Sequence, residues 1–178
     1  MAKLILIAVD LQKDFIDGAL GTKEAQGIVP AAAARIRDLR GAGAEIYATL
    51  DTHGEDYMQT REGRKLPVPH CIRGTDGWQL DASVMAALEG RAFTAIEKNT
   101  FGSDSLPEVV KKLSGGEDFT VTFIGLCTDI CVVSNALLLK AFFPEVPMRV
   151  DSRCCAGVTP RKHEAALETL RSCQFEVL

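Results

Sequence analysis

Apolar and polar positions alternate along the chain in two patterns. Short, almost continuously apolar runs such as "LILIAV" and "FTVTFIG" are typical of strands buried on both faces of a parallel sheet. Longer stretches between them carry apolar residues three and four positions apart, which indicates amphipathic helices. This alternation predicts the α/β class: a three-layer α/β/α sandwich with a mostly parallel sheet of about six strands.

The pattern places six strands and five helices along the chain. The predicted strands are Lys3–Val9, Glu45–Leu50, Ala92–Glu97, Phe119–Gly125, Met148–Val150 and Phe175–Leu178. The predicted helices are Val29–Ala42, Ala82–Leu88, Leu106–Leu113, Asp129–Phe143 and Thr159–Ser172. Because the 178 residues contain no visible linker or internal repeat, we expect a single domain over residues 1–178.

One segment, residues 51–80, does not follow the alternation. It contains Pro67, Pro69, several glycines and many charges, with little sign of regular structure. Long irregular insertions inside compact domains tend to be functional. Because the segment follows a strand, we expect it at the carboxyl edge of the sheet, where open α/β folds bind their ligands.

Composition excludes several classes of function. A net charge of -4 without a basic cluster argues against nucleic acid as a partner. The apolar runs are far shorter than the roughly 18–20 residues that cross a bilayer, and no signal-peptide cleavage site follows the first one, so we expect no membrane partner. Six cysteines without a C-x-x-C pair predict reduced thiols rather than a disulfide framework. We therefore expect a cytoplasmic protein that acts on a small molecule.

Chemically capable side chains follow four of the predicted strands. Asp10 follows the first strand, Asp51 and His53 the second, Lys98 the third, and Cys131 lies a few residues beyond the fourth. Each has an ordinary structural interpretation: a turn or cap for Asp10, a surface position for Lys98 and a small core residue for Cys131. Because parallel strands end at the same edge, their joint placement favours a common site.

Three of these residues suit nucleophilic catalysis. A helix N-terminus and the nearby ammonium of Lys98 would lower the pKa of the Cys131 thiol and favour the thiolate. Asp10 would take the thiol proton and return it to a leaving group. The backbone N–H groups around Cys127 and Cys131 lie at the strand-to-helix turn and would form an oxyanion hole.

Two of the three histidines belong to a second set. Asp51 and His53 stand two positions apart in "DTH", and "PHC" brings His70 back from the far end of the irregular segment. Two imidazoles and one carboxylate with open positions suit one divalent metal ion, zinc first, with manganese or iron as alternatives. Glu62 is a candidate fourth ligand, directly or through water. The alternative is a loop held together by polar hydrogen bonds.

Taken together, these motifs resemble the isochorismatase-like cysteine hydrolases, and within them the nicotinamidases. The segments "VDLQKDF", "DTH", "PHCIRGTDGW", "EKNTFGS", "GLCTDICV" and "TPRKHEAALETL" occur in the family's order and cover nearly the whole chain. The resemblance implies a Rossmann-like fold and a catalytic triad of Asp10, Lys98 and Cys131. It also implies a cis peptide bond between Leu126 and Cys127, which turns backbone N–H groups toward the substrate carbonyl oxygen.

The same resemblance implies a metal-assisted amidohydrolase that acts on a linear amide bond. Nicotinamide would give nicotinate and ammonia through a thioester on Cys131, as part of NAD salvage. The metal, held by Asp51, His53 and His70, would hold the pyridine nitrogen or waters around it. Family members also suggest a homodimer or homotetramer.

The resemblance is incomplete around the substrate ring. Phe15 matches one of the aromatic residues that sandwich the ring in nicotinamidases, whereas Val68 stands where an aromatic residue is common. "KNTFGS" also differs from the more familiar sequence after the triad lysine. Two alternatives therefore stay open: another small amide, carbamoyl compound or vinyl ether as substrate, or a noncatalytic scaffold with the same fold.

Overall fold

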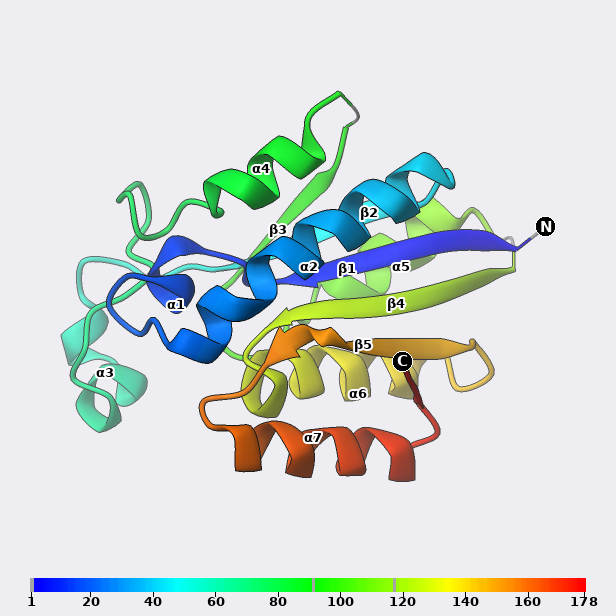
Figure 1. Ribbon diagram of the computed structural model, residues 1–178. Helices are drawn as coiled ribbons and strands as arrows, with labels where there is room; N and C mark the ends of the chain where they lie inside the picture. The colour runs from blue at the N-terminus through cyan, green and yellow to red at the C-terminus, as the bar shows by residue number, and fades with distance from the viewer. Residues whose placement is uncertain (1, 91, 117) are drawn as a thin grey trace.

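The computed structural model describes residues 2–90, 92–116 and 118–178. Its centre is a six-stranded parallel sheet with the strand order β3-β2-β1-β4-β5-β6 (Figure 1). The strands are β1 (Lys3–Val9), β2 (Glu45–Asp51), β3 (Thr94–Lys98), β4 (Phe119–Leu126), β5 (Met148–Ala156) and β6 (Glu176–Val177). The predicted α/β class and number of strands are confirmed, and every strand pair is parallel.

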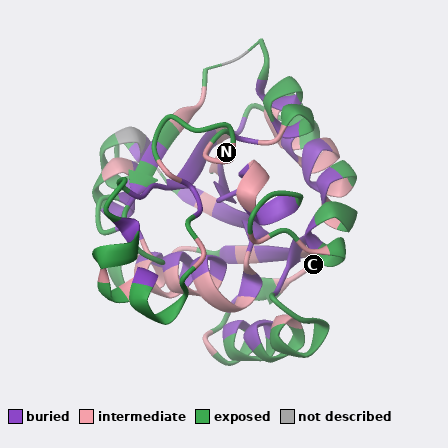
Figure 2. Ribbon diagram, turned by 90° about the vertical axis from the view of Figure 1, so that its left-hand side faces the viewer, coloured by how far each residue is buried: buried purple, intermediate pink, exposed green. Residues whose placement is uncertain are grey.

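Helices cover both faces of this sheet. They are α1 (Lys13–Ile16), α2 (Lys23–Gly41), α3 (Arg61–Lys65), α4 (Ala82–Leu88), α5 (Leu106–Ser114), α6 (Val133–Phe142) and α7 (Pro160–Ser172). The helices α1, α2 and α4 pack on one face, and α5, α6 and α7 pack on the other (Figure 1). Along β1, Leu6 and Ala8 contact the first layer, whereas Ile5, Ile7 and Val9 contact the second. Burial on both faces explains the continuously apolar run, and Figure 2 shows the buried residues concentrated in the sheet.

The helix α2 begins well before its predicted start at Val29. Thr22 caps it, because its hydroxyl oxygen accepts a hydrogen bond from the Ala25 N–H at 3.0 Å. Pro30 consequently lies inside the helix instead of in its first turn. The weakly apolar first turns did not show the helical period, so the sequence prediction began too late.

The strand β5 continues far beyond its predicted end at Val150. The part beyond Val150 begins with Asp151, whose buried carboxylate pairs with Arg35 of α2 at 3.3 Å and with Arg153 at 3.1 Å. The sequence prediction missed this extension because the charged residues Asp151 and Arg153 interrupt the apolar pattern. Cys154 lies within the strand rather than after it.

Other elements agree with the predictions more closely. The predicted helix Asp129–Phe143 begins as a π-helical turn over Thr128–Val132 and continues as α6. The irregular segment contains a 3₁₀ turn at Tyr57–Gln59 and the short α3. All six cysteines are free thiols, as expected. Among the described residues, no helix is both long and apolar enough to cross a membrane.

The strand order changes direction between β1 and β4. From β1 the chain adds β2 and β3 on one side of the sheet, and β5 and β6 lie on the other side of β4. Gly125, near the end of β4, has φ 120°, and a Cβ there would overlap the carbonyl oxygen of Val9, so glycine allows the two strands to approach. Open α/β sheets bind their ligands outside the carboxyl ends of the strands at such a point.

Candidate active site

Three of the predicted residues meet beyond the carboxyl ends of β1, β3 and β4. Lys98, the last residue of β3, places its Nζ 2.7 Å from Asp10 Oδ2 and 3.6 Å from Cys131 Sγ. Asp10 is fully buried, and Lys98 and Cys131 are each 5% exposed. One ammonium group thus contacts both a carboxylate and a thiol, an arrangement suited to moving a proton between them.

Asp10 is held by the neighbouring strand β2. Its backbone has φ 47°, in the left-handed region that residues other than glycine rarely adopt. Its N–H donates to the Thr49 carbonyl oxygen at 3.1 Å, and the Thr49 hydroxyl donates to Asp10 Oδ1 at 2.6 Å. Burial raises the pKa of Asp10, although the charge on Lys98 opposes this. The raised pKa of Asp10 therefore lies closer to the pKa that a general base needs to work near neutral pH.

Cys131 lies in the π-helical turn that precedes α6. Burial raises the pKa of its thiol well above the ordinary value, the Asp10 carboxylate raises it further, and Lys98 opposes both. This direction is opposite to the thiolate that the helix terminus and lysine suggest in the sequence. Because Asp51 is a second carboxylate beside Lys98, the single ammonium is already balanced. The raised pKa favours the thiol over the thiolate, and Asp10 is placed to accept its proton.

The turn between β4 and α6 begins at a cis peptide bond between Leu126 and Cys127, the position that the family resemblance indicates. The Cys127 carbonyl oxygen accepts hydrogen bonds from the N–H groups of Ile130 at 3.0 Å and Val132 at 3.1 Å. Burial raises the pKa of Cys127 to about 12. Burial raises the pKa of both thiols, so the pKa does not separate them; Cys131 remains the nucleophile candidate because its Sγ lies 3.6 Å from Lys98 Nζ.

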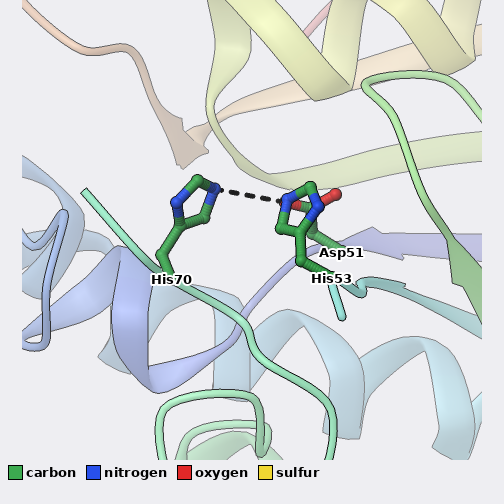
Figure 3. A group of neighbouring side chains, drawn as sticks. All are labelled: Asp51, His53 and His70. Atoms are coloured by element: carbon green, nitrogen blue, oxygen red, sulfur yellow. Dashed lines mark hydrogen bonds and ion pairs between the residues drawn. The ribbon is translucent and has the colours of Figure 1, made fainter. Parts of the chain in front are cut away.

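The three predicted metal ligands form a compact set (Figure 3). Asp51 Oδ2 lies 3.0 Å from His53 Nε2 and 3.5 Å from His70 Nε2. Glu62 Oε1 is 3.9 Å from both Nε2 atoms. His70 Nδ1 donates to the Val68 carbonyl oxygen at 2.8 Å, so Nε2, which faces Asp51, is the nitrogen that would lose its proton to bind a metal ion. These donors fit a divalent transition metal ion.

Asp51 connects the two sets. Its Oδ1 accepts a hydrogen bond from Lys98 Nζ at 3.0 Å, while its Oδ2 faces the histidines. Burial would raise the pKa of Asp51, but hydrogen bonds from His53 and His70 and the charge on Lys98 lower it below the ordinary value. Asp51 is therefore ionised at neutral pH, as both a metal ligand and a partner of Lys98 require.

The buried Gln12 holds the main chain of Asp51. Its Oε1 accepts from the Asp51 N–H at 2.7 Å, and its Nε2 donates to the Asp51 carbonyl oxygen at 2.9 Å. Sequence reasoning missed this residue. Gln12 stands two positions after Asp10 in "VDLQKDF", but nothing local indicates that its amide reaches the second strand.

Asn135 has a similar positioning role on α6. Its Nδ2 donates to the carbonyl oxygens of Cys131 at 2.8 Å and Phe101 at 3.0 Å, and its Oδ1 accepts from the Ser103 N–H at 2.9 Å. It thus ties the turn carrying Cys131 to the loop after β3. A polar residue one helical turn after Cys131 is the only signal for it in the sequence.

A cavity of about 260 Å³ opens beside both sets. Its chemically capable lining residues are Asp51, Glu62, His70, Cys127 and Cys131. The other lining residues are mostly apolar: Phe15, Leu20, Thr22, Ala25, Leu66, Phe101, Leu126, Ile130, Gly157 and Val158. No lysine or arginine is among the described residues that line it. The cavity therefore presents carboxylates, imidazole and a thiol within an apolar wall.

The ring contacts proposed from the sequence can be placed in this cavity. Phe15 lines it and meets the His70 ring edge to face, with 5.5 Å between ring centroids. Val68 is not among its described lining residues; the same segment contributes Leu66 instead. In this structure Leu66, rather than the residue at position 68, supplies the side chain that this segment contributes to the described wall.

The fold and this cluster define the class of protein: a hydrolase with a three-layer α/β/α fold and a buried cysteine, lysine and aspartate at the switch point of its sheet. The chain belongs to the isochorismatase family, whose isochorismatase domain model matches residues 4–178. It is 26% identical over 142 residues to the uncharacterised isochorismatase family protein PncA of Bacillus subtilis, covering 76% of this chain and 77% of that protein.

Solved structures with the same fold include two amidases. The pyrazinamidase/nicotinamidase of Streptococcus mutans matches with a TM-score of 0.86 and 26% identity, covering 99% of this chain and 100% of that one. The pyrazinamidase of Pyrococcus horikoshii, solved in complex with zinc, matches with a TM-score of 0.79 and 27% identity, covering 99% and 98%. The protein is an isochorismatase-family hydrolase that is structurally close to nicotinamidases and pyrazinamidases.

Proposed function

We propose that this protein is a metal-assisted cysteine amidohydrolase that converts nicotinamide to nicotinate and ammonia. The observation that carries the proposal is that one cavity is lined by Cys131 and by two members of the metal set, Asp51 and His70. A ring nitrogen and a carboxamide on the same small substrate would face these two groups together. The similarity to solved nicotinamidases and pyrazinamidases supports the same substrate class.

The charge of the cavity wall favours a neutral amide over the alternative substrates. Asp51 and Glu62 line the cavity, and the described lining contains no cationic lysine or arginine. An isochorismate-type vinyl ether or an N-carbamoyl amino acid carries carboxylates, which would be buried beside Asp51 and Glu62 with no lysine or arginine in the described lining to pair with them. Nicotinamide is uncharged, and the apolar wall suits its aromatic ring.

The metal set would orient the ring. When bound, a divalent ion would supply a coordination position for the pyridine nitrogen and would act as a Lewis acid. Asp51, His53 and His70 would hold it, with Glu62 facing both imidazoles as a further ligand. Phe15 packs against His70 at the cavity wall and would restrict the plane of the ring.

The reaction needs two acyl transfers at Cys131. Asp10 accepts the thiol proton while the sulfur attacks the carboxamide carbon, and the C–S bond forms. Asp10 then returns the proton to nitrogen as the C–N bond breaks, which releases ammonia and leaves a thioester. A water molecule attacks the thioester carbon and gives a proton to Asp10. That proton returns to sulfur as the C–S bond breaks, and the nicotinic acid that forms gives its carboxyl proton to water and leaves as nicotinate.

Lys98 and the backbone support both transfers. The Lys98 ammonium contacts Asp10 and Cys131 at once and so keeps base and nucleophile together. The backbone N–H groups around Cys127 and Cys131 would stabilise the oxygen of each tetrahedral intermediate. This assigns every buried polar group of the cluster a part in the same reaction.

Ammonia release and elemental analysis test the proposal. We expect the wild type to hydrolyse nicotinamide and to carry about one divalent ion per chain. Cys131→Ala should abolish hydrolysis and keep the metal, whereas His53→Ala should lose metal and hydrolysis together. Cys173→Ala, a cysteine outside the site, is the matched control and should behave like wild type. A metal-free wild type that hydrolyses nicotinamide well, or a metal-loaded one that ignores it, would contradict the proposal.

A further inference from the structure

The start of α7 is docked against the π-helical turn that carries the nucleophile candidate. His163 Nδ1 lies 2.8 Å from the hydroxyl oxygen of Thr128, which is fully buried and begins the turn. Beside this contact, the Val158 N–H donates to Asp129 Oδ1 at 2.9 Å. Two side-chain hydrogen bonds therefore fasten the segment 158–163 to consecutive residues of the turn.

The approach of the two segments depends on a glycine. Gly157 connects β5 to α7, and a Cβ at this position would lie 2.7 Å from His163 N and 2.8 Å from Asp129 Oδ1. Any larger residue would push the connection away from the turn. The His163 N–H donates to the Thr159 carbonyl oxygen at 2.9 Å, so the histidine sits in the first turn of α7. The first turn of α7 thus holds the His163 imidazole against the π-helical turn.

His163 has no direct place in the reaction described above. It is not among the described residues that line the cavity. Burial lowers the pKa of His163, against the opposing charges of Glu164 and Asp129. A neutral imidazole can accept the Thr128 hydroxyl proton at Nδ1 as a hydrogen bond. Its effect on chemistry must therefore pass through Thr128.

We propose that His163 is a positioning residue: by holding Thr128 it fixes the backbone of residues 127–131 in the conformation that binds the oxygen of a tetrahedral intermediate. The inference rests on the proposed function, because an amide or thioester substrate forms such an intermediate at Cys131. Thr128 lies between the two residues whose backbone N–H groups would donate to that oxygen. A shift of the turn would misplace these donors without removing the thiol, the base or the metal ligands.

An aldehyde probe isolates this effect from turnover. Pyridine-3-carboxaldehyde with a ¹³C-labelled carbonyl carbon should react reversibly with Cys131: the C–S bond forms, the C=O double bond becomes a single bond, and the thiol proton passes to the new oxygen. That oxygen would occupy the proposed oxyanion site. NMR detection of the tetrahedral carbon during titration gives the dissociation constant of the adduct.

Substitutions of His163 by asparagine and by glutamine distinguish a role of the hydrogen bond from a role of packing alone. Asparagine places a polar atom close to the position of Nδ1, whereas glutamine places one near Nε2. We expect His163→Ala and His163→Gln to bind the aldehyde about 10- to 100-fold more weakly, and His163→Asn to remain close to wild type. With nicotinamide, kcat should fall in the same order while KM and metal content stay unchanged. Glu164→Gln, an exposed neighbour, is the control and should match wild type.

Thr128→Val removes the hydroxyl group that forms the hydrogen bond with His163 Nδ1. The double variant with His163→Ala should bind the aldehyde no more weakly than either single variant, because both changes remove one interaction. Additive losses, or equal affinities in the asparagine and glutamine variants, would overturn the inference. A wild type that forms the adduct but ignores nicotinamide would refute the proposed function and leave the positioning role supported. A wild type that forms no adduct would overturn the positioning role.

Discussion

Substitution of Lys98 by methionine tests the charge balance of the site. In the folded protein one buried ammonium group faces two buried carboxylates, Asp10 at 2.7 Å and Asp51 at 3.0 Å. Methionine has a similar length but no charge, so Lys98→Met leaves both carboxylates without this partner. Removing one partner of a buried ion pair costs about 3–5 kcal/mol. We expect the free energy of unfolding to fall by about that amount near pH 8, with nicotinamide turnover lost.

The loss of stability should depend on pH. Burial raises the pKa of Asp10 even in the wild type, and Lys98 opposes this, so the pKa should rise further in the variant. A carboxyl group with a raised folded pKa favours folding below its unfolded pKa of about 4, and this contribution is lost as pH rises through the folded pKa. The deficit of the variant relative to wild type should therefore be largest near pH 8 and shrink toward about pH 5.

Urea unfolding of both proteins near these two pH values measures the effect. Chelator treatment is needed, because a bound metal stabilises the folded state by mass action. Lys112→Met, on the exposed face of α5, is the matched control and should change the unfolding free energy by less than about 0.5 kcal/mol. A Lys98→Met deficit no larger than this control, or one that is equal at the two pH values, would refute the reasoning.

Two further predictions concern Asp10 and Gln12. Because Asp10 must be ionised to accept the thiol proton and burial raises its pKa, the rising limb of the kcat/KM profile should lie above the ordinary carboxyl range; a limb within that range would identify a different base. Asp10→Asn should reduce kcat by about 10²–10⁴-fold. Gln12→Ala removes both hydrogen bonds that hold the main chain of Asp51 and should weaken zinc binding about 10- to 100-fold, measured by competition with a chelator. Unchanged zinc affinity would show that Asp51 needs no such support.

The fold was predictable where the stabilising contacts follow local periodicity. The strand β1 is apolar at every position that is buried on one face or the other, so its place in a covered parallel sheet can be read from the sequence. The part of β5 beyond Val150 could not be predicted in this way. Asp151 is tolerated there because Arg35, more than a hundred positions away along the chain, pairs with it.

The same distinction applies to the site. Asp10 and Lys98 could be predicted because each directly follows or ends a strand, and parallel topology brings those ends together. Gln12 and Asn135 could not, because they act through hydrogen bonds to residues 39 and 32 to 34 positions away. The pKa of Cys131 was also predicted in the wrong direction. A helix terminus and a lysine are visible in the sequence, whereas burial beside a carboxylate is a property of the fold.

Asp51 contacts both His53, a candidate metal ligand, and Lys98, the partner of Cys131. A substitution at Asp51 therefore affects both groups of residues. Its Oδ2 faces His53 and its Oδ1 pairs with Lys98, so Asp51→Asn would weaken the ligand set and the charge balance around the thiol at once. His53 instead meets the Asp51 and Glu62 carboxylates and the Tyr57 ring, on the metal side of the site. Loss of activity in His53→Ala leaves the Asp51–Lys98 pair in place and would therefore point to metal binding, whereas the same loss in an Asp51 variant would not separate the two roles. His53 is thus the position at which the contribution of a bound metal ion to this chemistry can be tested.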